Sequence, residues 1–375
     1  MKLLIATGLY PPEIGGPATY ATMLEQSLPG HQIETEVVPF GWVRGYPKVF
    51  RHFVYAFKLW QASRAADVMY ALDPISVGLP AMVVAKLRGL PFMIRLGGDY
   101  AWEQGRVRFG VTDTLDDYIK DVSVYSLPVR ILANIQSLVT RQASLVIVPS
   151  EYLKTIVAQW GVDETSIVVI YSALFPLMVE GSKDTLRHQL VYRQPTIVTA
   201  GRLVPWKGFR LLIILMAKLR EEYPEILLVI VGDGPDRPLL ESLVDKYRLR
   251  EQVRFVGSVS KEALGAAIKA GDVFVLNTAY EGLSHQLLEV MDLGTPVVTT
   301  TAGGNPELIT HGVSGLLVPF NDDYALTEAV RYILNQPEAG ARMVQSARLR
   351  TKEFTQAVVV ERFVTVLREW YGETT

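Results

Sequence analysis

The chain of 375 residues contains no cysteine. This absence excludes a disulfide framework and cysteine-ligated zinc, and it suits a protein of the reducing cytoplasm. We therefore expect a cytoplasmic protein.

Long hydrophobic runs and a strong charge of one sign are also missing. No stretch reaches the roughly 18 apolar residues that a membrane-spanning helix needs; the longest candidate, residues 74–94, is interrupted by Pro80, Lys86 and Arg88. The net charge of −2 argues against nucleic acid as a partner, because nucleic-acid binders carry strongly basic domains. The mean hydropathy of +0.20 is high for a freely dissolved protein and favours contact with a membrane surface.

What the chain does contain is a double series of short, continuously apolar runs separated by helical patterns. Continuous rather than alternating apolar runs are typical of parallel strands buried on both faces, so we predict an α/β fold with doubly wound sheets. The β/α rhythm breaks near residue 174, which predicts two Rossmann-like domains facing each other across a cleft. The expected strands are 2–7, 35–40, 67–72, 91–96 and 144–150 in the first half, and 196–201, 226–232, 253–257, 272–277, 296–300 and 315–319 in the second.

The loop after the first expected strand reads "GLYPPEIGGPATY". It lacks the Gly-x-Gly-x-x-Gly pattern of nicotinamide-binding proteins. It does supply Gly15 and Gly16 ahead of Pro17 and a helical run. Such a glycine pair at a helix start lets backbone N–H groups approach an anion, although a plain turn would also need glycine.

The corresponding loop of the second half reads "AGRLVPWKGF" and contains Arg202 and Lys207. Two cations at the end of a first strand can hold a diphosphate from two directions, the alternative being a pair of solvated surface cations. In the next such loop, "VGDGP", we interpret Asp233 as a residue that stabilises its turn.

The stretch "NTAYEGLSHQLLEVMDLGTPVVTT" holds two carboxylates, Glu281 and Glu289. We expect Glu281 before a helix that runs from Leu283 and Glu289 in its second turn, so that the two can bind different parts of one elongated ligand. A carboxylate can accept hydrogen bonds from two sugar hydroxyls, and the first N–H groups of the helix lack acceptors of their own. The alternative is an exposed Glu281 and a Glu289 paired with a cation. We interpret His285 as structural rather than catalytic.

Taken together, these segments resemble the retaining glycosyltransferases of GT-B fold, specifically glycosyltransferase family 4, over nearly the whole chain. The resemblance lies in "PPEIGGPATY", "GRLVPWKG", "VGDGP", "VRFVGSV", "EGLSHQLLEVMDLGTPVV" and "GGNPELITHGVSGLLVP". It implies an acceptor-binding domain at 1–173, a nucleotide-sugar-binding domain at 174–355 and a C-terminal helix within 356–375 that returns to the first domain.

The resemblance also implies the roles of individual residues. Arg202 and Lys207 neutralise the diphosphate, Glu281 holds the transferred sugar and Glu289 holds the ribose. The backbone N–H groups of Gly282, Leu283 and Ser284 face the phosphate or the sugar, and Gly15 and Gly16 approach the donor from the first domain. The chain has no Asp-x-Asp pair, so we expect neither a metal ion nor a cofactor, the nucleotide sugar being a co-substrate.

One segment departs from the family pattern. After the expected strand 91–96, many relatives carry a histidine near the reacting sugar, but this sequence reads "GGDYAWEQG". We predict that Asp99 takes over as a sugar or acceptor ligand, with Glu103 as an alternative. A turn residue is the other interpretation of Asp99.

The stretch of residues 46–64 has no acidic residue. On a helical wheel, Lys48, Arg51, His52, Tyr55 and Lys58 fall on one side, and Val49, Phe50, Phe53, Phe57 and Trp60 fall on the other. Such a helix suits an anionic membrane surface or a lipid-diphosphate acceptor. The alternative is that the aromatic side packs on the sheet and the basic side is solvated.

The sequence thus predicts a hexosyltransferase that uses a nucleoside-diphosphate sugar and a glycan or lipid-linked acceptor, in cell-surface polysaccharide or glycolipid synthesis. We expect it in the cytoplasm, peripheral on the inner face of the membrane. A sugar-nucleotide epimerase of the same fold and a non-catalytic nucleotide-sugar-binding protein are the alternatives.

Overall fold

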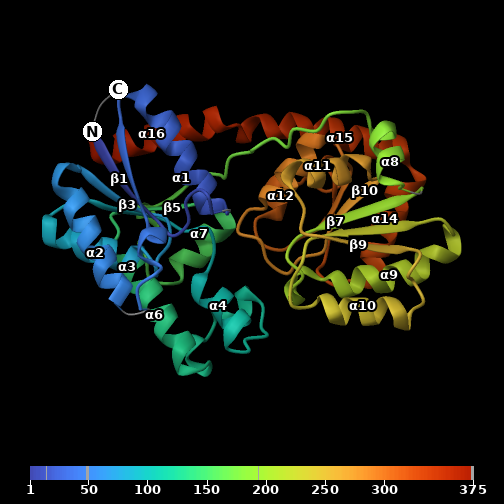
Figure 1. The fold of residues 1–375 in the computed structure, drawn as a ribbon, viewed down its shortest axis with the longest axis horizontal. Coiled ribbons are helices and arrows are strands. Elements are labelled where there is room, and N and C mark those ends of the chain that lie inside the picture. Colours follow the sequence, from blue (N-terminus) through green and yellow to red (C-terminus); the bar gives the residue numbers. More distant parts are fainter. Residues whose placement is uncertain (14, 48–49, 193, 373–375) are drawn as a thin grey trace. The chain divides into compact units, whose positions relative to one another are not determined.

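A computed structural model describes residues 1–13, 15–47, 50–192 and 194–372 (Figure 1). The chain forms two compact units. Unit 1 comprises Met1–Ala173 together with Gln356–Thr375, of which 373–375 lie outside the described residues, and unit 2 comprises Leu174–Thr355.

Unit 1 is built on a six-stranded parallel sheet of order β2-β1-β3-β4-β5-β6. Its strands are β1 (Lys2–Thr7), β2 (Glu34–Pro39), β3 (Val68–Ala71), β4 (Phe92–Arg95), β5 (Leu145–Val148) and β6 (Ile167–Val169). Its helices are α1 (Gly16–Ser27), α2 (Phe50–Ala62), α3 (Gly78–Arg88), α4 (Tyr100–Arg108), α5 (Leu115–Tyr118), α6 (Leu127–Arg141), α7 (Glu151–Ala158) and α16 (Gln356–Tyr371), with short 3₁₀ turns η1 (Leu28–His31), η2 (Phe40–Val43), η3 (Ser63–Ala65), η4 (Val122–Val124) and η5 (Glu164–Ser166).

The central strands of unit 1 are buried because their apolar side chains face helices on both sides of the sheet. Every residue of β3, β4 and β5 is buried. The strand β6 was missed by sequence analysis. It has three residues, lies at the sheet edge and is only partly buried, so its apolar run is too short to stand out.

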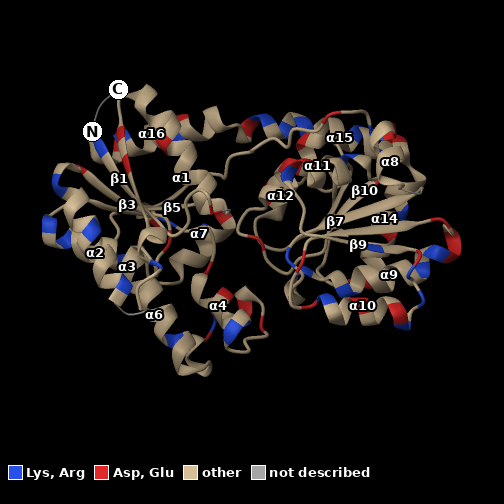
Figure 2. Ribbon diagram, viewed as in Figure 1, with Lys and Arg blue, Asp and Glu red and all other residues tan. Residues whose placement is uncertain are grey.

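Helices cover both faces of this sheet. Helix α2 packs against α3, and α3 packs against α6 (Figure 1). These three helices carry Lys and Arg but no Asp or Glu (Figure 2). Helix α16 packs against α1. It is fixed to the rest of unit 1 by the Arg368 guanidinium, which donates to the His31 carbonyl at 3.0 Å, and by the Phe363 ring, 5.6 Å from that of Tyr70.

Unit 2 repeats the plan with a second six-stranded parallel sheet of order β12-β11-β10-β7-β8-β9. Its strands are β7 (Thr196–Ala200), β8 (Leu227–Val231), β9 (Val253–Gly257), β10 (Val273–Leu276), β11 (Val297–Thr300) and β12 (Leu316–Val318). Its helices are α8 (Lys183–Leu190), α9 (Phe209–Glu222), α10 (Arg237–Lys246), α11 (Lys261–Ala270), α12 (His285–Leu293), α13 (Asn305–Leu308), α14 (Asp323–Asn335) and α15 (Pro337–Thr351), with the 3₁₀ turns η6 (Pro205–Lys207) and η7 (Lys352–Phe354).

The core of unit 2 forms where α9 and α14 pack on the sheet. Leu212, Met216 and Leu219 of α9 are at most 1% exposed and lie with Ile230 and Val330 in one apolar cluster. Each such side chain contributes on the order of 2 kcal/mol through burial, which fixes the strand ends from which the loops emerge.

The strand orders and helix placements confirm the predicted α/β class with two doubly wound parallel sheets. In each sheet the direction of strand addition reverses once, between β1 and β3 in unit 1 and between β7 and β10 in unit 2. Ligands of open α/β sheets bind beyond the carboxyl ends of the strands at such switch points. No helix among the described residues is long and apolar enough to cross a membrane.

Candidate functional site

The candidate site of unit 2 lies where the loops after β7 and β10 meet, at the switch point of the sheet. Gly208, which has a φ of +57°, approaches Asn277 so closely that a methyl group on it would lie 2.4 Å from the Asn277 carbonyl oxygen. The Asn277 amide donates to the Gly208 carbonyl at 3.1 Å, and the Ala279 N–H donates to that of Trp206 at 2.8 Å. The two loops therefore form one structure.

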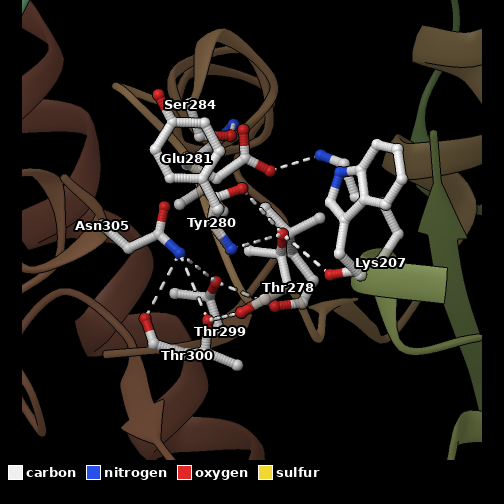
Figure 3. Close-up of polar contacts among 11 residues, drawn as sticks. Lys207, Thr278, Tyr280, Glu281, Ser284, Thr299, Thr300 and Asn305 are labelled. Carbon is white, nitrogen blue, oxygen red and sulfur yellow. Dashed lines mark hydrogen bonds and ion pairs between the residues drawn. The ribbon is translucent and has the colours of Figure 1, made fainter. Parts of the chain in front are cut away.

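This junction brings together two of the predicted site residues. The Lys207 ammonium forms an ion pair with the Glu281 carboxylate (Figure 3). Their side chains are 19% and 16% exposed, so both groups remain accessible to a ligand while being largely shielded from solvent. The alternative of a fully exposed Glu281 is wrong, because its carboxylate lies against the turn that carries Lys207.

The backbone of Glu281 is held by the loop after β11. The Gly304 N–H donates to the Glu281 carbonyl at 2.9 Å. A methyl group on Gly303, whose φ is +60°, would lie 2.0 Å from that same oxygen. Only glycine permits this approach, so the "GG" of this loop sets the position of the carboxylate.

Helix α12 begins at His285, two residues later than the predicted start at Leu283, because Ser284 is its N-cap. The Ser284 hydroxyl accepts from the Leu287 N–H at 3.3 Å. Within the described part of the chain, the N–H groups of Gly282, Leu283 and Ser284 donate to no acceptor. They lie between Glu281 and a nine-residue helix, where an anion or a hydroxyl oxygen can accept from them.

Arg202 lines a separate cavity of about 330 Å³ beyond the carboxyl ends of β7 and β8. Two glycines that line this cavity, Gly201 and Gly232, lie in close contact. A methyl group on Gly232 would lie 2.0 Å from the Gly201 carbonyl oxygen. Asp233 also lines the cavity and accepts from the Gly234 N–H at 2.7 Å, which agrees with its predicted turn role. Gln286, in the first turn of α12, joins this cavity to the helix that follows Glu281.

Glu289 lies in the second turn of α12, as predicted, and is partly buried. Burial raises the pKa of its carboxyl to about 7, while Lys261 opposes the rise. Lys261 attracts this carboxylate electrostatically, but no close ion pair joins Glu289 to a cation within the described part of the chain. A carboxyl poised in this way can accept hydroxyl hydrogen bonds once it ionises.

Sequence reasoning missed a buried polar network beneath the site (Figure 3). Asn305 is fully buried, and its amide nitrogen donates to the Thr300 carbonyl and to the Thr299 hydroxyl, both at 3.3 Å. The Thr300 hydroxyl donates to the Thr278 carbonyl at 2.6 Å. The sequence indicates this network only through the polar residues that follow two otherwise apolar runs, in "VLNT" and "VTTT".

In unit 1, Gly15 directly precedes α1 and Gly16 is its first residue, with Pro17 in the first turn as expected. The Gly15 carbonyl accepts from the Thr19 N–H at 3.1 Å. A methyl group on Gly15 would lie 2.7 Å from a methyl carbon of Leu9, so this position also has a packing reason to be glycine. Contact of Gly15 and Gly16 with a donor stays a prediction.

Asp99 serves as the N-cap of α4, where its carboxylate accepts from the Trp102 N–H at 2.9 Å. It is 1% exposed, and burial raises the pKa of its carboxyl. This geometry supports the turn-residue interpretation, and a substrate contact of Asp99 stays a prediction. Glu103 lies in the first turn of the same helix.

The helix predicted near residues 46–64 forms as α2, but its buried side is not the one that the sheet-packing alternative requires. Tyr55, expected on the basic side, is fully buried and donates from its hydroxyl to the Val38 carbonyl at 2.7 Å. Phe50, Phe53 and Phe57 are exposed, so packing of the aromatic side on the sheet is wrong. Lys48 and Val49 lie outside the described residues.

A catalytic histidine and a metal site have weaker support in the described residues. His285 is exposed at the first position of α12. Among the residues that the structure describes, no group of three or more His, Asp or Glu side chains is placed to hold a metal ion.

Comparison with known proteins agrees with this two-unit organisation. Residues 10–173 match the model of the glycosyl transferase 4-like domain, and residues 183–350 match that of glycosyl transferases group 1. The fold is similar to that of Anabaena HepE in complex with UDP, with a TM-score of 0.79, 20% identity and coverage of 98% of this chain and 100% of the other. The fold class is therefore GT-B.

Two curated relatives are more similar in sequence over shorter segments. Alpha-D-kanosaminyltransferase of Streptomyces kanamyceticus is 34% identical over 154 residues, 41% of this chain and 40% of the relative. The lipopolysaccharide core biosynthesis glycosyltransferase LpsD of Rhizobium meliloti is 34% identical over 170 residues, 45% of this chain and 48% of the relative. The chain thus spans less than half the length of either relative. Two successive segments of the chain thus match glycosyltransferase domains, and the fold is that of GT-B proteins.

Proposed function

We propose that the protein transfers a hexose from a nucleoside-diphosphate sugar to a glycan or lipid-linked acceptor, with retention of the anomeric configuration. The observation that carries this proposal is the contact of Lys207 with Glu281 at the switch point of unit 2. This contact places a cation that can bind phosphate beside a carboxylate that can bind hydroxyl groups. A sugar phosphate ester needs both kinds of group for its recognition.

The donor diphosphate is the ligand assigned to Arg202 and Lys207. Arg202 can bind two phosphate oxygens through its planar guanidinium, and Lys207 supplies a point charge. The N–H groups of Gly282, Leu283 and Ser284 add fixed donors that need no reorganisation when charge develops on the leaving group. These groups supply the positive potential that a divalent cation supplies elsewhere, so we propose transfer that does not require a metal ion.

The sugars of the donor are assigned to the two glutamates. Glu281 accepts from hydroxyls of the transferred hexose, and Glu289 accepts from the ribose. Glu289 is the fourth residue after the helix start at His285, a spacing that suits the two ends of one elongated ligand. A donor hydroxyl would also compete for the Glu281 carboxylate that Lys207 holds in the free protein.

In the proposed reaction, the bond between the anomeric carbon and the phosphate oxygen breaks and a bond to the acceptor oxygen forms on the same face of the sugar. The acceptor hydroxyl gives its proton to the leaving phosphate oxygen. Arg202 and Lys207 stabilise the negative charge of that leaving group. Glu281 fixes the ring through its hydroxyls, which aligns the anomeric carbon with both oxygens.

The acceptor and the cellular setting are proposed from weaker observations. The similarity to a glycosyltransferase of lipopolysaccharide core biosynthesis supports a cell-surface glycan or lipid-linked acceptor. The absence of cysteine supports a cytoplasmic location, and the exposed aromatic residues of α2 support attachment to the inner face of the membrane.

The experiment that tests this function has two stages. A thermal-shift screen of UDP-, GDP- and ADP-sugars identifies the donor, because a ligand that binds the folded chain raises its Tm. The selected donor is then incubated with the protein and a membrane extract, with and without EDTA. Release of nucleoside diphosphate that depends on the extract supports transfer. A changed sugar epimer without acceptor supports the epimerase, and binding without any product supports a sensor.

A further inference from the structure

Helices α2, α3 and α6 of unit 1 present exposed apolar side chains on the sides that face away from the sheet. Phe53 and Phe57 of α2 are 68% and 60% exposed, Leu87 of α3 is 70% exposed and Leu127 of α6 is 65% exposed. We define the outer face by these exposed residues on the three helices: Phe50, Phe53, Phe57, Val83, Leu87, Leu127, Ile131 and Leu138.

The exposed residues are spaced so that they form one stripe on each helix. In α2 they recur at intervals of three and four residues, in α3 at four, and in α6 at four and seven. The opposite sides of the same helices hold buried residues, including Tyr55, Ala85 and Val129. Because α2 packs on α3 and α3 on α6, the three stripes lie on neighbouring helices. Apolar residues gathered on one face of a protein mark an interaction surface.

Two further aromatic residues extend the outer face beyond the start of α2. Trp42 and Tyr46 are both exposed. The ring of Tyr46 lies 6.1 Å from that of Phe50, and the Lys58 ammonium lies 5.5 Å from the centre of the Trp42 ring. A lysine beside an indole is the combination that sits at the level of lipid headgroups, with the ring in the apolar boundary and the charge in water.

The charge on the three helices has one sign. Arg51, Lys58, Lys86, Arg88, Arg130 and Arg141 are their only Lys, Arg, Asp or Glu residues. The helices of the α1–α16 layer differ, since they carry Glu25, Glu361 and Glu369. The whole chain has 39 acidic and 37 basic residues, so a six-to-none excess on three helices is a local property.

We infer that the outer face binds the surface of an anionic lipid bilayer, with its aromatic and aliphatic side chains in the boundary between headgroups and acyl chains. Lys86, Arg130 and Arg141 are exposed and can complement the negative headgroups, and each Lys or Arg near such a surface strengthens attachment about fivefold. A second copy of the chain fits this face less well, because a two-fold contact would place the cations of one copy against the same cations of the other.

This inference concerns a surface built only from unit 1, whereas the donor site lies in unit 2. The two can therefore be tested separately. The full-length protein is sedimented with vesicles of phosphatidylcholine alone and with vesicles in which about one third of the lipid is phosphatidylglycerol. We expect co-sedimentation with the anionic vesicles and little with the neutral ones.

Two pairs of variants probe the two components of the face. Phe53→Ser with Phe57→Ser removes apolar contact, and Lys58→Gln with Lys86→Gln removes two charges. We expect each pair to weaken binding to anionic vesicles by about tenfold or more. The matched controls in unit 2 are Met178→Ser with Tyr324→Ser, at comparably exposed positions, and Lys246→Gln with Lys352→Gln. These controls should bind as the wild type does.

The inference is overturned if both vesicle types bind equally or not at all, or if the outer-face variants bind as well as their controls. It is also overturned if light scattering shows a dimer that Phe53→Ser with Phe57→Ser converts to a monomer, because the face would then join two copies. Nucleotide-sugar binding measured on every variant shows that unit 2 is folded. Loss of transfer alone, with vesicle binding intact, would count against the proposed function and not against this surface.

Discussion

The Lys207 ammonium and the Glu281 carboxylate form an ion pair between the loops that follow β7 and β10. Sequence analysis assigned these residues to two different parts of the donor, and the structure brings them into direct contact. In the free protein each group therefore satisfies the other. A donor must replace this contact with one from its phosphate to Lys207 and one from its hydroxyls to Glu281.

This competition predicts opposite effects of the two neutral substitutions. Glu281→Gln should leave the affinity for the nucleoside diphosphate unchanged or improve it, because Lys207 is released, while kcat falls by about a hundredfold or more. Lys207→Gln should weaken the binding of the nucleoside diphosphate by about tenfold or more. Calorimetric titration and initial rates measure these effects. A parallel loss of diphosphate affinity in both variants would contradict the assignment of separate roles.

The raised pKa of Glu289 predicts a particular dependence of stability on pH. Its carboxyl changes from an ordinary pKa of 4.5 to about 7 on folding. Between these pH values the folded chain therefore binds more protons than the unfolded chain. The stability that the protonated Glu289 gives to the folded chain is lost as the pH rises through about 7. At about 1.4 kcal/mol for each pKa unit, the loss of unfolding free energy at pH 8 is at most about 3.5 kcal/mol.

Glu289→Gln removes this titration. Urea unfolding should show that the variant and the wild type have similar free energies of unfolding near pH 5, and that the variant is the more stable one near pH 8. Equal slopes of stability against pH for the two proteins would show that Glu289 titrates normally.

The approach of Gly303 to the Glu281 carbonyl predicts a cost for a single methyl group. Gly303→Ala forces the loop away from Glu281, because its Cβ would lie 2.0 Å from that oxygen. We expect a loss of about 3 kcal/mol in unfolding free energy and a loss of about a hundredfold in transfer, since displacement by an ångström misaligns the carboxylate.

Gly312→Ala is the matched control for that prediction. Gly312 also has a positive φ, +76°, but a Cβ there would meet no atom within 4 Å. The Gly312→Ala substitution should lower the free energy of unfolding only by the backbone strain, about 1–2 kcal/mol, and should leave transfer unchanged. Similar losses of transfer in both variants would mean that the contact with Glu281 has no special importance.

The buried position of Asp99 predicts that its main role is to cap α4. Asp99→Asn keeps an oxygen that can accept from the Trp102 N–H, so it should retain transfer, whereas Asp99→Ala should lose about 1 kcal/mol of stability. Urea unfolding and initial rates separate the two effects. If Asp99→Asn folds normally but loses transfer, its charge acts on a substrate and the role predicted from the sequence is restored.

Much of the fold could be predicted from the sequence because continuous apolar runs report burial on both faces of a sheet. All strands were expected except β6, whose three residues are only partly buried at the sheet edge. The start of α12 was predicted two residues early, at Leu283 rather than His285, since Ser284 acts as the N-cap and the helix begins only after it.

The candidate site could be predicted only where a single loop carries the signal. Lys207 and Glu281 stood out because glycines flank them, but their contact depends on two strands that are distant in sequence and adjacent in the sheet. The same holds for Asn277 and Asn305, whose hydrogen bonds cross from loop to loop. The orientation of α2 stayed open at the level of the sequence, because amphipathicity shows two different sides of a helix without showing which one faces the sheet.

The central claim is that Arg202 and Lys207 together bind the diphosphate of the donor. Calorimetric titration of the nucleoside diphosphate into Arg202→Gln with Lys207→Gln tests it most directly, beside a control with Arg342→Gln and Lys352→Gln at exposed positions of the same unit. The account predicts that the Kd of the first variant rises by about a hundredfold or more while the control matches the wild type. A Kd that both variants share with the wild type would contradict it.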